Sequence, residues 1–216
     1  MFKVLSQLSE KIIVKLWICP LCRVEDRRFL WATREFNLVQ CNRCGLVYKS
    51  SSREVSEAAV NKELYDEELI KRRGWGRRRL TMVARRRVGV LQQYLPKGRK
   101  ILEIGCGTGE FAEAAKRTGY RIEGVETSKV LAEYVRREIG IECFNGKIED
   151  LDRKRRDYDA IAAFDVIEHV AKAGGFVQEI IRRLKEGGFI FLEMPNWRCW
   201  ERLVWGCKWN MLNMRD

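Results

Sequence analysis

Four of the eight cysteines are spaced in a way that could bind a metal ion. Cys19 and Cys22 form one C-x-x-C pair, and Cys41 and Cys44 form a second pair after eighteen intervening residues. Each pair can place two thiolates on one tight turn, and two such turns that face each other give the tetrahedral sulfur site that zinc prefers. Because four protein ligands leave no position for water, we expect a structural zinc ion.

Two other interpretations of these cysteines stay open. Four unrelated buried thiols would need the matched spacing to arise by coincidence. A redox-active C-x-x-C is the other alternative, although neither pair opens a helix after a strand as in thioredoxin-like sites. The remaining cysteines lie in apolar or Trp-rich sequence, where we interpret them as ordinary thiols. This cysteine usage favours a reducing compartment.

A second chemical pattern is the run ILEIGCGTGEF, in which a hydrophobic strand leads through a glycine-rich turn into a helix. Gly105 and Gly107 allow the backbone to turn sharply and to approach a ligand without intervening β-carbons. Glu126 ends the next strand, where a carboxylate can accept both hydroxyl hydrogens of a ribose. A nicotinamide or flavin site would show the same features. The last glycine comes one residue earlier than in G-x-G-x-x-G, which favours a turn that faces an amino acid and a nucleoside.

Four segments in order, LEIGCGTGEF, GVETS, YDAIAAFDVIEHV and LKEGGFIFLEMPN, resemble the motifs of class I S-adenosylmethionine (SAM)-dependent methyltransferases. CPLC, CNRCGLVY, and YDEEL with the basic segment after it are similar to a subgroup with an N-terminal zinc ribbon. The resemblance covers most of the chain from Cys19 onward. It implies an enzyme that uses SAM and methylates a small-molecule acceptor of the sugar, lipid or metabolite class.

The resemblance also implies roles for residues at matching positions. Glu103, Gly105 and Gly107 would surround the methionyl part of SAM, and Glu126 would bind its ribose. Ile148 or Glu149 is the candidate for the adenine side, because Gly146-Lys147 stands where the family usually has Gly-Asp. The residues expected to line the cofactor and acceptor pocket at the end of the fourth strand are Phe164, Asp165, Glu168 and His169.

Glu168 and His169 are the catalytic candidates. Either side chain could act as a general base if the acceptor is a hydroxyl or an acidic carbon. An amine acceptor would need only a pocket that binds its neutral form. His169 is the only histidine of the chain, and a structural role for it is the alternative.

Alternating strand-like and helix-like segments must position these groups. KILEI, RIEGVE, DAIAAFDV and GFIFLEM are typical of buried strands. We expect helices at Glu110–Thr118, Ser128–Ile139 and Gly175–Lys185, and a long helix over Leu80–Leu95 before the first strand. This alternation predicts an α/β fold, and the resemblance implies a Rossmann-like class I methyltransferase sheet over residues 99–216. Before it we expect an amphipathic lead-in (1–18), the zinc ribbon (19–48) and a polar, then Arg-rich, helical linker (49–98).

The length of 216 residues and the hydrophobic content of 46% suit one medium domain with a small satellite. The net charge of +12 is concentrated between Lys71 and Lys100, which hold twelve Lys and Arg residues and no acid. This spacing predicts a helix with a basic face and a buried side formed by Leu80, Val83, Val88, Leu91 and Leu95. A solvated face is one explanation, and RNA methylation is the alternative function that it motivates. A non-catalytic zinc-ribbon adaptor is the third hypothesis.

The remaining expectations concern location and the C-terminal end. The sequence has no run of about 18 apolar residues and no signal-peptide cleavage site, so we expect a cytoplasmic protein with no membrane partner. Only 21 residues follow Pro195, where the resembled family has a further helix and two strands. We therefore expect the sheet to lack its last strands, with self-association through the uncovered edge. Cofactor binding would survive, whereas acceptor binding and turnover would be impaired.

Overall fold

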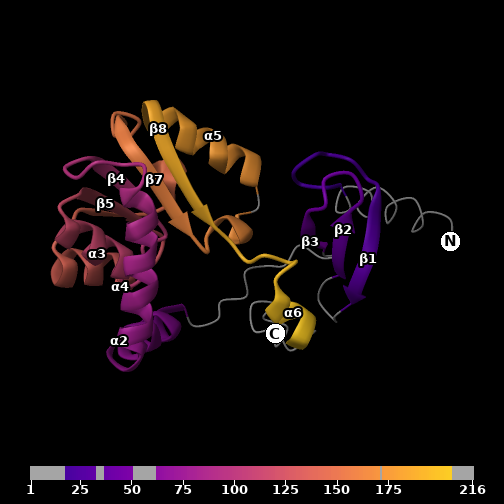
Figure 1. Ribbon diagram of the computed structural model, residues 1–216, viewed down its shortest axis with the longest axis horizontal. Coiled ribbons are helices and arrows are strands. Elements are labelled where there is room, and N and C mark those ends of the chain that lie inside the picture. The colour runs from indigo at the N-terminus through magenta and orange to yellow at the C-terminus, as the bar shows by residue number, and fades with distance from the viewer. Residues whose placement is uncertain (1–17, 33–36, 51–61, 171, 206–216) are drawn as a thin grey trace, which may run out of the picture. The chain divides into compact units, whose positions relative to one another are not determined.

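The computed structural model describes residues 18–32, 37–50, 62–170 and 172–205 (Figure 1). The chain divides into two compact units, one of Met1–Ala58 with Pro195–Asp216 and one of Ala59–Met194. The Arg-rich segment that we expected as a linker therefore belongs to the α/β unit. The α/β unit ends at Met194, and the segment after it is grouped with the ribbon.

The ribbon unit is a three-stranded antiparallel sheet. Its strands are β1 (Arg27–Ala32), β2 (Asn37–Cys41) and β3 (Val47–Ser50), in the order β1-β2-β3. One C-x-x-C pair lies before β1, and the other begins at Cys41, the last residue of β2, and continues into the turn before β3. The same unit holds the short helix α6 (Trp200–Trp205).

A parallel five-stranded sheet forms the centre of the α/β unit. Its strands are β4 (Lys100–Ile104), β5 (Arg121–Glu126), β6 (Cys143–Asn145), β7 (Tyr158–Phe164) and β8 (Leu184–Glu193). The strand order is β6-β5-β4-β7-β8, and every neighbouring pair is parallel. Along the chain, β5 and β6 are thus added on one side of β4, and β7 and β8 are then added on its other side. Such a reversal opens a crevice at the carboxyl ends of the strands, where open α/β sheets bind ligands.

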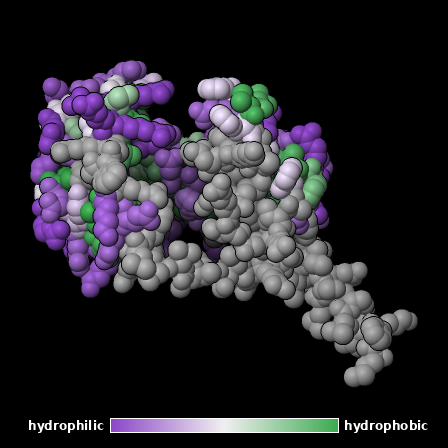
Figure 2. Space-filling view, turned by 90° about the horizontal axis from the view of Figure 1, so that it is seen from below, coloured by the Kyte–Doolittle hydropathy of each residue, from purple (hydrophilic) through white to green (hydrophobic). Residues whose placement is uncertain are grey.

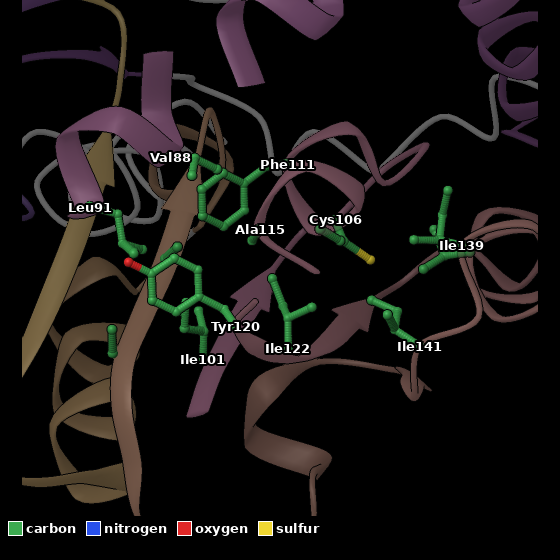
Figure 3. Close-up of a cluster of buried hydrophobic side chains, with 14 of the residues drawn as sticks. Val88, Leu91, Ile101, Cys106, Phe111, Ala115, Tyr120, Ile122, Ile139 and Ile141 are labelled. Carbon is green, nitrogen blue, oxygen red and sulfur yellow. The ribbon is translucent and has the colours of Figure 1, made fainter. Parts of the chain in front are cut away.

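Helices cover both faces of this sheet. One hydrophobic core (Figure 3) contains residues of α2 (Lys62–Gln92), α3 (Glu110–Thr118), α4 (Lys129–Tyr134) and the π-helical turn Val135–Ile139. α5 (Ala173–Arg183) contributes to a second core. Alternate residues of one strand serve the two faces, since Ile101 belongs to the first core and Leu102 to the second. Burial on both faces explains why β4, β5 and β7 read as continuous hydrophobic runs. β8 differs from the prediction of a buried strand, because each of its residues is at least partly exposed.

Most predicted elements are confirmed, with differences at their ends. α3 has the predicted bounds, and α4 begins after Ser128, whose Oγ accepts the N–H of Leu131 at 3.2 Å. α2 is much longer than predicted, and Leu80 and Val83 do not lie on a buried side, because each is 38% exposed. α5 ends at Arg183 and β8 begins at once, where we expected the helix to continue to Lys185.

The strand β8 lies at one edge of the sheet. Within the described residues it pairs only with β7, and Phe189 and Met194 expose 38% and 47% of their surface. Self-association through this edge stays a prediction. Hydrophilic residues cover most of the coloured surface of the α/β unit in Figure 2. Among the parts of the chain that the structure describes, no helix combines the length and apolar character that crossing a membrane requires.

Candidate functional site

The glycine turn after β4 has one open side. Gly105, Gly107 and Gly109 adopt φ angles of +70°, +51° and +80°. A β-carbon at Gly105 would lie 2.5 Å from Cγ2 of Val166, and one at Gly109 would lie 2.9 Å from Cγ1 of Ile139. A β-carbon at Gly107 would meet no atom within 4 Å. Gly105 and Gly109 therefore serve packing, whereas Gly107 leaves space in which a ligand can approach the backbone.

The Glu126 carboxylate joins this turn to the end of β5. Its Oε2 accepts the N–H of Gly107 and its Oε1 accepts the N–H of Ser128, both at 2.9 Å. The residue is 8% exposed, so its position is fixed before any ligand arrives. Oε2 keeps a second lone pair, and the second lone pair of Oε1 is contacted by the Thr127 hydroxyl only at 3.4 Å, so both oxygens can accept a hydrogen bond from a ligand hydroxyl.

Glu103 of β4 lies near the same edge of the sheet and is more deeply buried than Glu126. The residue is 4% exposed, and its Oε2 is buried without a hydrogen-bond partner among the described residues. Burial raises the pKa of its carboxyl well above the ordinary value, and the neighbouring Glu110 carboxylate raises it further. A buried polar atom without a partner is costly, so this oxygen is suited to a positively charged or hydrogen-bonding ligand group.

Arg87 connects α2 to the carboxyl ends of two strands. Its guanidinium donates to Glu193 at the end of β8 and, at 2.9 Å, to Asp165 just after β7. It also lies over the Phe164 ring, 4.3 Å from the centroid. Asp165 has a φ angle of +56° and donates its N–H to the Glu193 carbonyl at 2.9 Å. This arrangement fixes α2 beside the crevice.

Sequence reasoning missed Arg87 and Glu193 as parts of the site. Arg87 looked like one basic residue among many, and only contacts between distant parts of the chain single it out. A signal was available for Glu193, because it is an acid at the carboxyl end of a hydrophobic strand segment, as Glu126 is. The phenyl ring of Phe164 also packs edge-on against Phe111, with ring centroids 4.8 Å apart.

The two catalytic candidates lie on the 3-10 turn Ile167–His169 that follows β7. Both Glu168 and His169 are exposed, and partial burial of the Glu168 carboxyl raises its pKa. Ile148 is different, since it is 2% exposed within the second core and has little surface left for an adenine ring. The carboxyl edge of the sheet thus holds the glycine turn, Glu103, Glu126 and the end of β7. The Ile148 side chain points into the core instead.

The structure also has a groove of about 450 Å³ between α2 and α3. Its lining carries charges of both signs, including Arg85, Glu110 and Arg117. Of the residues discussed for the crevice, only Glu110 lines it. We therefore place the candidate site by the side-chain geometry of the crevice and not by this groove.

The four cysteines of the ribbon unit form a separate cluster. The Sγ atoms of Cys19, Cys22, Cys41 and Cys44 all lie within 4.8 Å of one another. The Cys19–Cys44 and Cys22–Cys41 sulfur distances are 3.6 and 3.4 Å. Sulfurs about 2.3 Å from a tetrahedral zinc ion would lie about 3.8 Å apart, close to these distances. This donor set could therefore hold one zinc ion.

The backbone shapes both cysteine turns in the same way. Arg23 and Gly45, the residues after the second cysteine of each pair, have positive φ angles of 61° and 76°. Arg23 donates its N–H to the Cys19 carbonyl and Gly45 donates to the Cys41 carbonyl. The N–H of Cys44 lowers the pKa of Cys41 to about 7, whereas burial and the neighbouring thiols raise the pKa values of Cys22 and Cys44. Matched turns of this kind aim two pairs of sulfurs at one point.

A doubly wound sheet with a glycine turn and an acid at the next strand defines a nucleotide-type binding domain. Comparison with known families gives its class. The family described as "Methyltransferase domain" matches residues 75–215. The chain belongs to this methyltransferase domain family.

Among curated proteins, the chain is similar to ubiquinone biosynthesis O-methyltransferases. The protein from Nitrobacter winogradskyi is 34% identical over 116 residues, which cover 50% of this chain and 43% of that protein. The protein from a Bradyrhizobium species is 31% identical over 121 residues, covering 52% of this chain and 47% of that protein. The chain thus matches less than half the length of these relatives.

Solved structures support the fold. A TehB-like SAM-dependent methyltransferase from Corynebacterium glutamicum superposes with a TM-score of 0.52 at 22% identity. The match covers 70% of this chain and 81% of that one. The predicted Rossmann-like methyltransferase sheet is therefore confirmed. The zinc-ribbon subgroup is not confirmed by these relatives.

Proposed function

We propose that this protein transfers the methyl group of SAM to a small-molecule acceptor. The observation that carries the proposal is the Glu126 carboxylate, which is fixed between the N–H groups of Gly107 and Ser128 beside an open turn. Ribose hydroxyls can donate to its free lone pairs, and the backbone at Gly107 can approach the ligand closely. Family membership supports this assignment.

The residues present fit the charge of SAM. Glu103 offers a buried oxygen that has no hydrogen-bond partner in the described part of the chain, and Glu110 and Glu126 add two more carboxyl groups around the turn. SAM carries a sulfonium and an ammonium group against one carboxylate, so an acid-rich pocket suits it. When bound, SAM supplies an already activated methyl group for in-line displacement. The protein's task is then to align the acceptor and exclude water.

The acceptor side is the end of β7. Phe164 and Asp165 line it, and Glu168 and His169 follow on the 3-10 turn. The names of the relatives specify O-methylation, which supports a hydroxyl acceptor here. A hydroxyl gives up its proton during the reaction, and Glu168 is the base that we propose first, because its raised pKa brings it closer to neutral pH. His169 is the second choice.

A methyl-transfer assay tests the proposal. Purified protein would be incubated with SAM labelled in its methyl group and with fractions of a cell extract, with and without ribonuclease. We expect the label in a small-molecule fraction, unchanged by ribonuclease. Label that disappears with ribonuclease would favour RNA methylation, for which the exposed Arg78, Arg79, Arg85 and Arg86 on α2 offer a basic surface. Absence of SAM binding by the purified protein would favour the adaptor alternative.

We also propose that the cysteine cluster holds one structural zinc ion per chain. The support is the mutual approach of the four sulfurs within 4.8 Å. Metal analysis of freshly purified protein should give one zinc per chain, and Cys41→Ser should lose it because thiolate ligation is broken. Cys199→Ser is the matched control, since Cys199 is a free cysteine outside the cluster. Unchanged zinc in Cys41→Ser would contradict the proposal.

A further inference from the structure

Three carboxyl groups gather around the glycine turn, and they are not equivalent. Glu126 accepts two backbone N–H bonds, and Glu110 accepts the hydroxyl of Thr108 at 2.7 and 2.8 Å. Hydrogen bonds of this kind favour the ionised form of a carboxyl group. Glu103 has a buried oxygen with no donor among the described residues. It is therefore the group of the three that is least able to carry a negative charge in the free protein.

The groups that face Glu103 come from four elements. Glu110 at the start of α3, Glu126 at the end of β5 and Cys143 of β6 disfavour its negative charge. Arg87 of α2 favours it, but this guanidinium already donates to Asp165 and Glu193. The crevice around Glu103 is thus short of positive charge in the free protein. A ligand that brings a cation would supply what the site lacks.

We infer that Glu103 is neutral in the free protein and gives up its proton when SAM binds, so that cofactor binding is coupled to proton release. This inference rests on the proposed function, because it takes SAM as the ligand. The proton leaves the Glu103 carboxyl for solvent, and the resulting carboxylate pairs with a positive charge of the ligand. Glu103 thereby favours positively charged ligands, and it makes the affinity of the protein for SAM rise with pH.

The direction of the pH dependence follows from the proton balance. Because the complex holds fewer protons than its free components, raising the pH favours the complex. In the range where free Glu103 is protonated, the dissociation constant for SAM should fall by up to about tenfold per pH unit. The dependence should level off once free Glu103 is ionised.

Isothermal titration calorimetry can count the released protons. SAM would be titrated at pH 6.5 into the full chain in two buffers whose ionisation enthalpies differ, such as phosphate and Tris. At this pH the amino group of the ligand is already largely protonated, since α-amino groups titrate at about 7.7–8.0. The difference in observed enthalpy between the buffers gives the number of protons, and we expect release of about one proton per SAM in the wild type.

Two variants make the assignment specific. Glu103→Gln keeps the shape of the side chain but has no proton to lose, so it should bind SAM more weakly and release none. Glu133→Gln is the control, because Glu133 lies on α4, its side chain is 58% exposed, and its ion pair with Lys129 is long, at 4.0 Å. It should release the same number of protons as the wild type. Thermal unfolding of each variant would confirm that it is folded.

Titration with S-adenosylhomocysteine separates the two cations of SAM, because this ligand keeps the ammonium group but lacks the sulfonium. Proton release with both ligands would assign the ammonium as the partner of Glu103, and release with SAM alone would assign the sulfonium. SAM binding without proton release in the wild type would overturn the inference and leave the proposed function intact. Equal release in Glu103→Gln would overturn it as well. Absence of SAM binding in every protein would contradict the proposed function and this inference together.

Discussion

At the residue scale, the three glycines of the turn have different structural roles, although the sequence shows them as one motif. All three have positive φ angles, which side chains rarely adopt. Only at Gly107 is the space beyond the backbone open. The motif could be recognised from the sequence, but the division of labour within it depends on Val166 and Ile139, which come from distant parts of the chain.

These different roles predict different main effects for two similar substitutions, one on ligand binding and the other on stability. Gly107→Ala should cost about 1–2 kcal/mol of stability, the usual cost of a left-handed alanine, but should weaken SAM binding at least about tenfold because its β-carbon fills the approach to the backbone. Gly105→Ala should destabilise the fold more, since its β-carbon would lie 2.5 Å from Val166. Thermal unfolding and calorimetry with SAM measure the two effects. Unchanged SAM affinity in a folded Gly107→Ala variant would place the ligand elsewhere.

Glu103 should also leave a signature in stability without any ligand. Its pKa in the folded protein lies above the unfolded value, so the folded state holds a proton that the unfolded state releases. The free energy of unfolding contributed by this residue should therefore fall as pH rises above about 4.3, the ordinary glutamate pKa, towards the folded pKa. Because glutamine does not titrate, this pH-dependent loss of stability should be absent in Glu103→Gln. The melting temperature of the variant relative to wild type should rise between pH 5 and pH 8, and a constant difference would contradict the shifted pKa.

At the scale of elements, the strands and helices that carry the glycine turn were predictable from local pattern. KILEI and RIEGVE are buried on both faces, and Ser128 caps α4 as its position suggested. The three-residue strand β6 gave no distinct pattern, because so short a strand has no readable periodicity. The exposure of Leu80 and Val83 was mispredicted because helical spacing shows which residues share a face, but not how far along α2 the packing partner extends.

One buried side chain connects α5 to the loop between β6 and β7. Arg183 is 2% exposed and donates to the carbonyl groups of Ile148, Leu151, Asp152 and Arg155. It also pairs with Glu179 one helical turn earlier. Adjacent Arg182 pairs with the same glutamate but is 68% exposed. The two arginines therefore offer a matched comparison.

Arg183→Met should lower the free energy of unfolding by about 3 kcal/mol or more, because it removes a buried guanidinium that donates to four carbonyl groups and pairs with Glu179. Arg182→Met should change it by less than about 1 kcal/mol, as expected for an exposed ion pair. Denaturant unfolding of both variants measures the difference. Equal effects would show that the buried contacts contribute little to holding the loop.

At the scale of the whole molecule, charge and architecture are distributed unevenly. The Arg-rich segment that accounts for the net charge is an integral helix of the α/β unit, and one of its arginines, Arg87, is committed to Asp165 and Glu193. Family class and fold followed from the order of motifs along the chain. The identity of the acceptor did not, because acceptor pockets are shaped by side chains from several elements and by no single motif.

The central claim is that SAM binds at the carboxyl ends of β4 and β5 with its ribose on Glu126. Calorimetric titration of wild type and Glu126→Ala with SAM tests it most directly, with the exposed Glu133→Ala as control. We expect one site per chain in the wild type and in the control, and a loss of about 2 kcal/mol, roughly 30-fold in affinity, in Glu126→Ala because charge-assisted hydrogen bonds are lost. Equal SAM affinity in all three folded proteins, or no SAM binding by the wild type, would contradict it.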